Sequence, residues 1–488
     1  MYECKKFYVN GQWVDPIAAE EMTVINPATE EAVAVVALGG AADVDLAVKA
    51  ARAAFESFSN TSREYRVELL QNIEKEFMQR YDDISLAITA EMGSPITLSK
   101  QLQAATGVIH LQTYIKVLQD YQFEQDKGPT RIRREPIGVC GLITPWNWPI
   151  NQVACKVFPA LAAACTMVLK PSELTPVAAT MLAEVMDAAG VPDGVFNMVH
   201  GTGPVVGQAI CAHPDVDMVS FTGSTRAGRE VAIASAATIK RVAQELGGKS
   251  PNILVDDVDF AAAMAGALGN MMLNSGQSCA APSRLLVPKS KLAEVNEIAK
   301  QMLQGYVVGD PSREDINLGP VANKAQFDKV QGLIEKGIEE GATLVTGGPG
   351  KPEGLETGYY VRPTVFSDVS NDMSIAREEI FGPVLCIIPY EDDADAIRIA
   401  NDTDYGLSAY VTAEDKDRAR RIAEQLRAGS VFINGPDLDP MAPLGGYKQS
   451  GNGREWGVGG LEEYLETKSM LGFGEASDAD AENAVKLT

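Results

Sequence analysis

The sequence predicts an α/β protein made of two α/β units, and three observations lead to this expectation. Between residues 137 and about 260, short apolar segments alternate with helical patterns, and a second alternation of the same kind follows. Alternating strands and helices usually form a parallel sheet, with ligands at the carboxyl ends of the strands. The segment 121–135 departs from both units, because two alternating stretches flank Gly128-Pro129. We expect it to be a hairpin, and a protruding hairpin with an open edge suits subunit pairing.

The individual elements follow from local periodicity. About the first 115 residues carry helical patterns, as at 43–58 and 63–77, where apolar residues recur at spacings of three and four. The first α/β unit is expected to have helices at 175–189, 204–212 and 225–236, and strands at 139–144, 166–170, 195–200, 217–222, 241–246 and 252–256. The second unit is expected to have helices near 324–340, 392–401 and 415–427, and strands at 343–348, 359–366, 384–390, 407–412 and 430–434. The acidic tail after Lys468 is expected to be poorly ordered at its end.

Bulk composition excludes several classes of protein. A chain of 488 residues is too long for one ordinary core, so two or three domains are expected. The formal net charge of −24 disfavours nucleic acid and membrane partners, because an acidic surface repels phosphates and anionic lipids. The amino terminus lacks the apolar segment of a signal peptide, and no apolar run is long enough to span a membrane. We expect a cytoplasmic enzyme.

One cysteine is unlike the others. The chain has seven cysteines and no CxxC pair, which is typical of reduced thiols. Five lie in apolar segments and are expected to be packed in the core: Cys140, Cys155, Cys165, Cys211 and Cys386. Cys4, near the terminus, is expected to be exposed. Cys279 stands in "NSGQSCAAPSR", among small and polar residues that offer no apolar packing. The three histidines lack metal-ligand spacing, so we expect no metal site, and a base for Cys279 that is not histidine.

Several segments have the composition of ligand loops, although each also has a structural interpretation. "VSFTGSTRAGREVA" ends a strand at Thr222, and Ser224 is placed to cap the next helix, whose amino terminus suits a phosphate. A plain helix cap explains this segment equally well. "HGTGPVVG" contains Gly203 and Gly207 but is one residue longer than the usual dinucleotide motif, so it is weak evidence.

Charged residues appear at other strand ends. In "VLKPSELTP", Lys170 and Glu173 emerge where a nucleotide would lie, and a carboxylate there would bind ribose hydroxyls and repel a 2′-phosphate. In "AQELGGKSP", Glu245 would be a base if its burial raised its pKa. The structural alternatives are an exposed Lys–Glu pair in a turn and a salt-bridged surface carboxylate.

Two further segments complete the set. In "TPWNWPINQ", the Asn147 side-chain amide is a candidate oxyanion donor, with a structural turn as the alternative. In "EEIFGPVL", Glu379 and Phe381 would contact the ring and sugar of a ligand, or nothing.

Taken together and in this order, these segments resemble the aldehyde dehydrogenase superfamily. The matching pieces are "PWNWP", "KPSE", "FTGST", "ELGGKSP", "NSGQSC", "EEIFGPV", "FING" and "PLGGYKQSGNGRE". The resemblance implies oxidation of an aldehyde to the acid, with Cys279 as nucleophile and Glu245 as the base that activates the hydrolytic water. It also implies that the Asn147 amide and the Cys279 backbone N–H hold the oxyanion, and it places Lys156 near the pocket.

The same resemblance implies a nicotinamide cofactor, with NAD favoured over NADP because of the charge on Glu173. Lys170 and Glu173 would bind the adenosine ribose, Ser224 the pyrophosphate, and Glu379 with Phe381 the nicotinamide riboside. The full set of expected cofactor contacts is Ile143, Thr144, Trp146, Lys170, Ser172, Glu173, Gly203, Gly207, Phe221, Gly223, Ser224, Leu246, Glu379 and Phe381.

The substrate is less specified. Relatives that take aminoaldehydes or betaine aldehyde commonly have a Trp where Cys155 stands, and aromatic walls hold quaternary ammonium groups. We therefore expect a neutral aliphatic or aromatic aldehyde, while Asp437 and Asp439 leave a cationic aminoaldehyde open. The expected pocket residues are Trp148, Cys155, Ser278, Ala280, Leu438 and Leu444, with Met441 adding aliphatic surface.

The resemblance implies a fold with a Rossmann-like cofactor-binding domain, a second α/β catalytic domain and a small β oligomerisation arm, in a homodimer or homotetramer. The expected division is 1–119 and 137–247 for the cofactor domain, 120–136 for the hairpin, 248–440 for the catalytic domain, 441–467 for the return to the cofactor domain, and 468–488 for an oligomerisation strand and acidic tail. The alternatives are an aminoaldehyde or semialdehyde dehydrogenase, a CoA-acylating enzyme, which normally lacks the Glu base, and a non-catalytic structural relative.

Overall fold

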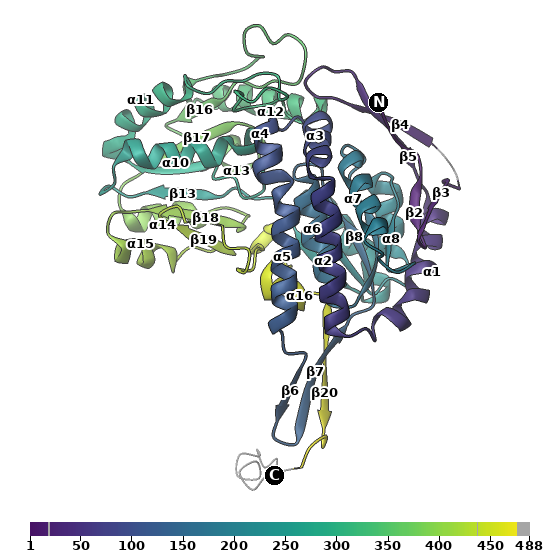
Figure 1. Cartoon of the computed structure of the whole chain (residues 1–488). Helices are drawn as coiled ribbons and strands as arrows, with labels where there is room; N and C mark the ends of the chain where they lie inside the picture. The colour runs from purple at the N-terminus through teal and green to yellow at the C-terminus, as the bar shows by residue number, and fades with distance from the viewer. Residues whose placement is uncertain (18–19, 437, 476–488) are drawn as a thin grey trace.

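A computed structural model describes residues 1–17, 20–436 and 438–475 of the chain. It has two lobes, each centred on a seven-stranded sheet, with a narrow three-stranded arm projecting below them (Figure 1). Both lobes follow the predicted α/β pattern. In the part of the chain that the structure describes, no helix is long and apolar enough to cross a membrane.

The first sheet has the strand order β12-β11-β8-β9-β10-β2-β3. Its five core strands are parallel, and β2 and β3 extend it with antiparallel pairing. The strands are β2 (Phe7–Val9), β3 (Gln12–Val14), β8 (Val139–Ile143), β9 (Thr166–Lys170), β10 (Phe196–Met198), β11 (Met218–Thr222) and β12 (Arg241–Glu245). Its helices are α1 (Ala41–Phe58), α2 (Arg63–Gln79), α3 (Tyr81–Met92), α4 (Ile96–Leu98), α5 (Ala105–Asp120), α6 (Pro149–Ala162), α7 (Pro176–Ala188), α8 (Gln208–Ala212), α9 (Thr225–Ser235) and α16 (Gly457–Glu462), with π-helical turns at Ser99–Gln103 and Gly203–Gly207.

The second sheet has the order β15-β16-β17-β14-β13-β18-β19, and only β15 is antiparallel to its neighbour. Its strands are β13 (Pro251–Leu254), β14 (Arg284–Pro288), β15 (Thr343–Thr346), β16 (Thr364–Ser367), β17 (Val384–Tyr390), β18 (Ser408–Thr412) and β19 (Ser430–Ile433). Its helices are α10 (Phe260–Met272), α11 (Leu292–Leu303), α12 (Lys324–Glu339), α13 (Ser374–Arg377), α14 (Asp393–Asn401) and α15 (Lys416–Ala423).

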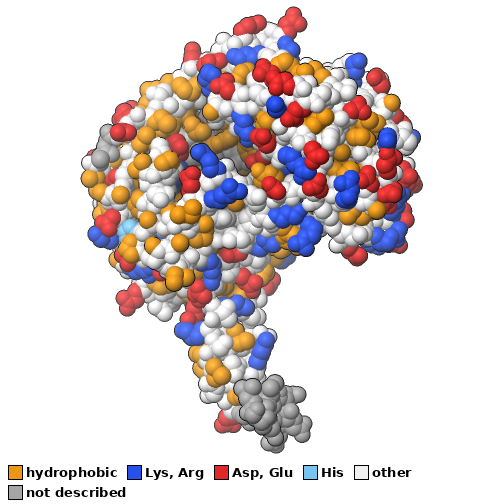
Figure 2. All heavy atoms as spheres, turned by 180° about the vertical axis from the view of Figure 1, so that it is seen from behind, with side chains coloured by type: hydrophobic (Ala, Val, Ile, Leu, Met, Phe, Trp, Pro, Cys, Tyr) orange, Lys and Arg blue, Asp and Glu red, His pale blue; other side chains and the backbone are white. Residues whose placement is uncertain are grey.

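The predicted hairpin is confirmed as β6 (Glu124–Lys127) and β7 (Thr130–Pro136). A third strand, β20 (Leu465–Leu471), pairs antiparallel with β7 along its whole length. One edge of the hairpin is therefore covered within the chain, while the other edge, β6, has no partner strand among the described residues. The arm projects away from both lobes in Figures 1 and 2. The end of the acidic tail, 476–488, lies outside the described residues.

Several sequence expectations were wrong. The amino-terminal segment is not only helical, because β2, β3 and a three-stranded sheet of β1 (Tyr2–Cys4), β5 (Ala32–Leu38) and β4 (Glu20–Ile25) precede α1. Cys4 is not exposed: β1 is only three residues long, but its pairing with β5 places this side chain in the core at 3% exposure. The strand expected at 252–256 belongs to the second sheet, and β14 was not anticipated. Of the strand expected at 359–366, only the last three residues form a strand, as the start of β16 (Thr364–Ser367).

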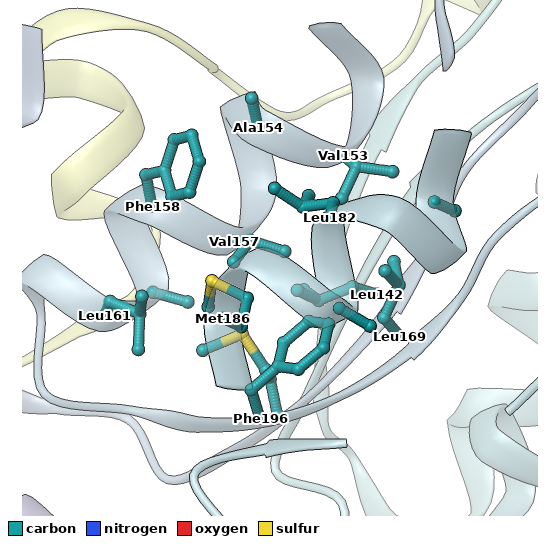
Figure 3. Close-up of a cluster of buried hydrophobic side chains, with 14 of the residues drawn as sticks. Leu142, Val153, Ala154, Val157, Phe158, Leu161, Leu169, Leu182, Met186 and Phe196 are labelled. Atoms are coloured by element: carbon teal, nitrogen blue, oxygen red, sulfur yellow. The ribbon is translucent and has the colours of Figure 1, made fainter. Parts of the chain in front are cut away.

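The core beneath the first sheet fixes helix α6, which later bears on the site. Val153, Val157 and Leu161 on α6 belong to the same buried cluster as Leu142 and Leu169 on β8 and β9, which the close-up in Figure 3 shows. All five side chains are at most 1% exposed. Burial of each such aliphatic side chain contributes roughly 1.5–3 kcal/mol, so α6 is rigidly held against the sheet.

On the face drawn in Figure 2, acidic and basic side chains are interspersed, with hydrophobic side chains scattered among them. This mixing means that the net negative charge of the chain does not gather into one acidic area on that face.

Candidate active site

The loop that carries Cys279 has an unusual backbone, and its sequence explains why. Asn274 and Ser275 both have φ of 54°, and Gly276 has φ of 72°, so three consecutive residues are left-handed. Glycine and asparagine adopt this conformation with the least strain. A Cβ on Gly276 would lie 2.1 Å from the carbonyl oxygen of Gly382, so only glycine fits there. The "NSG" sequence thus bends the chain out of α10 and turns Cys279 toward the space between the lobes.

Side-chain amides bind this loop to the segment containing Asn147. The Asn274 amide donates to the Asn147 carbonyl at 2.9 Å, and the Asn147 amide donates to the Gln277 carbonyl at 3.0 Å. The amide nitrogen of Gln103, on the first π-helical turn, donates to the Asn147 carbonyl and to the Asn274 side chain, both at 3.2 Å. Because an amide nitrogen has two N–H groups, the bond to Gln277 leaves one N–H of Asn147 free.

The neighbours of Cys279 are held as well. Trp148 donates through Nε1 to the Ser278 hydroxyl at 2.9 Å, which ties the start of α6 to the residue before the cysteine. Tyr410 on β18 donates to the Ala280 carbonyl at 3.0 Å, and its ring stacks on Phe432 at 4.8 Å. Both sides of the cysteine are thereby fixed.

Cys279 is partly exposed as a residue, unlike the six other cysteines, which are all buried. Desolvation, reinforced by the charges of Glu379, Glu245 and Glu455, raises the pKa of this thiol to about 12. In the absence of ligands the thiol is therefore protonated at neutral pH, and a base has to take its proton before it can act as a nucleophile.

Glu245 ends β12 and is 6% exposed. Neither of its carboxylate oxygens has a hydrogen-bond partner among the residues that the structure describes. A Cβ added to Gly445 would lie 2.8 Å from Oε1, so this glycine leaves room for the carboxyl group. Burial, together with the charge of nearby Glu455, raises the pKa of Glu245 well above its usual range. A buried, unpaired carboxyl group with a raised pKa suits a general base.

Next to Glu245 lies a buried ion pair that the sequence analysis only partly anticipated. Lys156 donates to one oxygen of Glu455 at 2.5 Å and to the Ser220 hydroxyl at 2.9 Å, while the Cys155 thiol donates to the other oxygen of Glu455 at 3.2 Å. Burial alone would lower the pKa of Lys156, but the attraction of Glu455 and further acidic groups raises it overall. Lys156 is therefore charged, and its charge opposes the rise in the pKa of Glu245.

The two glycines after Glu245 allow the two lobes to meet. A Cβ on Gly247 would lie 2.5 Å from an oxygen of Glu379, and one on Gly248 would lie 2.4 Å from the Cys279 carbonyl oxygen. The Gly248 N–H donates to Glu379 at 2.9 Å. Glu379 and the Cys279 backbone therefore pack directly on this pair of glycines.

An aromatic pair stands beside Glu379. Phe381 has φ of 62°, a strained value for an aromatic residue, and its ring meets Trp146 edge to face at 5.5 Å. Gln326 on α12 holds this conformation by donating to the Phe381 carbonyl at 2.8 Å, and Lys329 donates to the Glu379 carbonyl at 2.6 Å.

The expected nucleotide-binding residues lie at the carboxyl ends of the first sheet. Ser224 caps α9, accepting from the Ala227 N–H at 3.3 Å, as the sequence predicts. A Cβ on Gly223 would lie 2.5 Å from the Phe221 ring, so this turn requires glycine. Lys170 donates to Glu173 at 2.9 Å.

A cavity of about 200 Å³ brings many of these residues together. Its lining residues are Pro145, Trp146, Asn147, Gln152, Thr222, Gly223, Ser224, Leu246, Gly247, Cys279, Gln326, Lys329, Glu379 and Phe381.

Other predicted site residues do not line this cavity. Glu245 is buried next to the lining residue Leu246, and Cys155 and Lys156 are fully buried. Leu438 is 46% exposed, Leu444 is half-buried, and Asp437 lies outside the described residues. Three other predicted cofactor contacts, Ile143, Thr144 and Ser172, are buried. Gly203 and Gly207 bound the second π-helical turn.

The sequence analysis missed several residues of this site. Glu455 stands in the quoted "NGRE" segment, but nothing local marked it as buried beside Lys156. Gln103, Gln152, Gln326 and Lys329 come from helical segments whose amphipathic pattern gives no sign of a site. Asn274 had a signal, since Asn before Ser-Gly favours a left-handed turn.

Comparison with known proteins identifies the class. The model of the aldehyde dehydrogenase family matches residues 13–470. A Pseudomonas sp. protein named 3-succinoylsemialdehyde-pyridine dehydrogenase is 56% identical over 474 residues, covering 97% of this chain and 99% of the relative. The chain thus belongs to the aldehyde dehydrogenase family, whose members are oxidoreductases.

Two solved structures are closely similar. A mutant of aldehyde dehydrogenase C from Pseudomonas syringae, in complex with NAD+ and octanal, has a TM-score of 0.96 and 54% identity, covering 97% of this chain and 98% of its own. A Mycobacterium tuberculosis aldehyde dehydrogenase in complex with NAD+ has a TM-score of 0.94 and 40% identity, covering 96% of this chain and 98% of its own.

Proposed function

We propose that this protein oxidises an aldehyde to its carboxylic acid with NAD, using Cys279 as nucleophile and Glu245 as base. The observation that carries the proposal is the free amide N–H of Asn147 in the same cavity as Cys279, with the unpaired buried carboxyl group of Glu245 next in sequence to two residues that line it, Leu246 and Gly247. Nucleophile, oxyanion donor and base are the groups that acyl chemistry through a thioester needs.

In the first half of the reaction, Glu245 takes the proton of Cys279 and passes it to solvent, and the sulfur forms a bond to the aldehyde carbon. The carbonyl π electrons move to oxygen, where the free N–H of Asn147 and the Cys279 backbone N–H stabilise the negative charge. The C–H bond then breaks with its electron pair, the C=O bond forms again, and Cys279 carries a thioester. NAD, when bound, supplies the acceptor for that hydride.

In the second half, a water oxygen attacks the thioester carbon while Glu245 takes a proton from the water. The C–S bond breaks, the acid leaves, and Cys279 departs as thiolate. The charged Lys156–Glu455 pair adjusts the pKa of Glu245 and is therefore assigned a positioning role.

The residues present fit NAD. Gly223 and the capped amino terminus of α9 form a turn that no larger side chain could occupy, which suits a pyrophosphate. Lys170 and Glu173 are assigned to the adenosine ribose, and Glu379 with Phe381 to the nicotinamide riboside. The other cofactor contacts expected from the sequence are likewise proposed to bind NAD. Glu173 disfavours NADP by charge repulsion with a 2′-phosphate, so NAD is the preferred cofactor.

The substrate we propose is a neutral aliphatic or aromatic aldehyde. The two charged groups lining the cavity are both engaged within the protein, since Lys329 donates to the Glu379 backbone carbonyl and the Glu379 carboxylate accepts from the Gly248 N–H. The octanal in one solved relative agrees with this choice, whereas the name of the Pseudomonas sp. relative favours the semialdehyde alternative. The alternatives are an aminoaldehyde or semialdehyde dehydrogenase, a CoA-acylating enzyme and a non-catalytic relative, and the unpaired Glu245 disfavours the last two.

We also propose a cytoplasmic homodimer or homotetramer in which the arm of β6, β7 and β20 mediates pairing, because the edge of β6 is free in the described chain. The seven free thiols suit a reducing compartment. The division into cofactor, catalytic and oligomerisation segments is proposed with the boundaries predicted from the sequence.

The test measures NADH formation by purified protein with NAD and a panel of neutral, amino and carboxy aldehydes, without CoA. We expect activity that a Cys279→Ser variant lacks. An inactive wild-type protein, with NADP and CoA also tried, would refute the proposal in favour of a non-catalytic relative.

A further inference from the structure

One polar side chain in the active-site cavity has no function in the mechanism above. Gln152 lies in the first turn of α6, where its N–H donates to the Trp148 carbonyl at 2.9 Å. Its side chain lines the same cavity as Cys279 and Asn147, and the residue is 5% exposed.

The side-chain amide of Gln152 is unused within the described chain. Its Oε1 is buried without a hydrogen-bond partner, and its amide nitrogen donates to none of the residues that the structure describes. The other amides of the site are occupied: Asn147 and Asn274 donate to backbone carbonyls, and so does Gln326. The buried amide oxygen costs free energy as long as it lacks a partner, and the amide N–H groups, which make no bond to the described residues, are free to donate to a ligand in the cavity.

The helix that carries this side chain is fixed. Val153 and Val157 on α6 are buried in the core of the first lobe (Figure 3), and Trp148 ties the start of the helix to Ser278 beside the nucleophile. The backbone of Gln152 is therefore held at a fixed place relative to Cys279, which suits recognition of a group at a fixed place along a substrate.

The chemistry of that group follows from what surrounds it. Lys329 donates to the Glu379 carbonyl, and Glu379 accepts from Gly248, so the charged groups of the cavity are engaged beside the expected nicotinamide position. The Gln152 amide brings no charge that would balance an ionised group, and it can bond neutral groups of several kinds: a ketone or ring nitrogen accepts from its N–H, and a hydroxyl can accept from the N–H or donate to the amide oxygen.

We propose that Gln152 is a specificity-determining residue that hydrogen-bonds a second, neutral polar group on the aldehyde substrate. This inference rests on the proposed function. It narrows the substrate class from neutral aldehydes in general to those that carry a ketone, hydroxyl or ring nitrogen along the chain. A site built to bond such a group discriminates against the analogue that lacks it, because the polar side chain is then left unpaired.

The experiment compares two probe aldehydes that differ only in one group: benzoylpropanal, which has a ketone, and phenylbutanal, which has a methylene in its place. For the wild-type protein with NAD, we expect kcat/KM to be about tenfold higher for the ketone. In Gln152→Leu we expect that ratio to fall to near one. The matched control is Gln112→Leu on the exposed face of α5, where the ratio stays at the wild-type value.

The ratio separates recognition from folding, since a merely structural defect lowers kcat/KM for both probes alike. Equal use of both probes by the wild-type protein would overturn the inference, and so would an unchanged ratio in Gln152→Leu. Oxidation of neither probe, nor of any other aldehyde tried, would instead overturn the proposed function itself.

Discussion

The raised pKa of the Cys279 thiol makes a quantitative prediction about its reactivity without ligands. A pKa of about 12, against 9.0 for an ordinary cysteine, leaves a thiolate fraction of about one in ten thousand at pH 8, compared with about one in ten. Since the thiolate is the nucleophile, alkylation by iodoacetamide should be up to about a thousandfold slower than for a free cysteine. The rate should still be rising with pH above the range where ordinary thiols have levelled off.

The perturbation is Glu379→Gln, which removes the largest charge acting on this thiol. We expect the variant to be alkylated faster at any fixed pH, because its Cys279 pKa falls. Glu378→Gln, at the exposed neighbouring position, is the matched control and should behave as the wild-type protein does.

The assay follows modification of the Cys279 peptide by mass spectrometry across a pH series without NAD, with Cys279→Ser to identify labelling of other thiols. An ordinary midpoint near pH 8.5 in the wild-type protein, or identical rates in both Glu variants, would refute the electrostatic reasoning.

Three other predictions test separate parts of the structure. Gly248→Ala places a Cβ 2.4 Å from the Cys279 carbonyl oxygen, so NADH formation should fall at least about a hundredfold through displacement of the nucleophile; near-normal turnover would contradict this packing. Glu173→Ser removes the charge opposed to a 2′-phosphate, so kcat/KM with NADP should rise relative to NAD; an unchanged cofactor ratio would count against the ribose assignment. Glu91 on α3 is fully buried, and its carboxyl group accepts from two backbone N–H groups at the amino terminus of α7. Burial raises the pKa of Glu91 to about 8, so the folded state keeps a proton that the unfolded chain releases from about pH 4.5 upward. The contribution of Glu91 to stability is therefore full below pH 4.5 and is lost toward pH 8, at up to about 1.4 kcal/mol per pH unit. Urea unfolding at several pH values should show that the free energy of unfolding depends less steeply on pH in Glu91→Gln than in the wild-type protein. Equal slopes in the two proteins would argue against a raised pKa at Glu91.

The sequence predicted well those features that depend on neighbours along the chain. The hairpin around Gly128-Pro129, the Ser224 cap and the strand that ends at Glu245 all follow from local patterns, and all are present. Likewise, the absence of apolar neighbours correctly set Cys279 apart from the buried cysteines.

What the sequence could not predict depends on partners far along the chain. The strand β13 has the same apolar pattern in either sheet, and only its pairing with β14 and β18 assigns it to the second. Glu455 is polar and unremarkable in sequence, because its function depends on Lys156, 299 residues away. The burial of Cys4 could not be predicted for a similar reason: a strand of three residues is too short to show an alternating pattern, and its place in the core depends on pairing with β5.

The pair Gly247-Gly248 lies where the chain passes from β12 in one lobe to β13 in the other. Glu245 and Asn147 are synthesised with the first sheet, Cys279 and Glu379 with the second, and Glu455 close to the carboxyl end. An emerging chain on the ribosome therefore carries Asn147, Glu245 and the thiol for many residues before Glu379 and Glu455 exist. The complete set of site residues can assemble only when synthesis is almost complete.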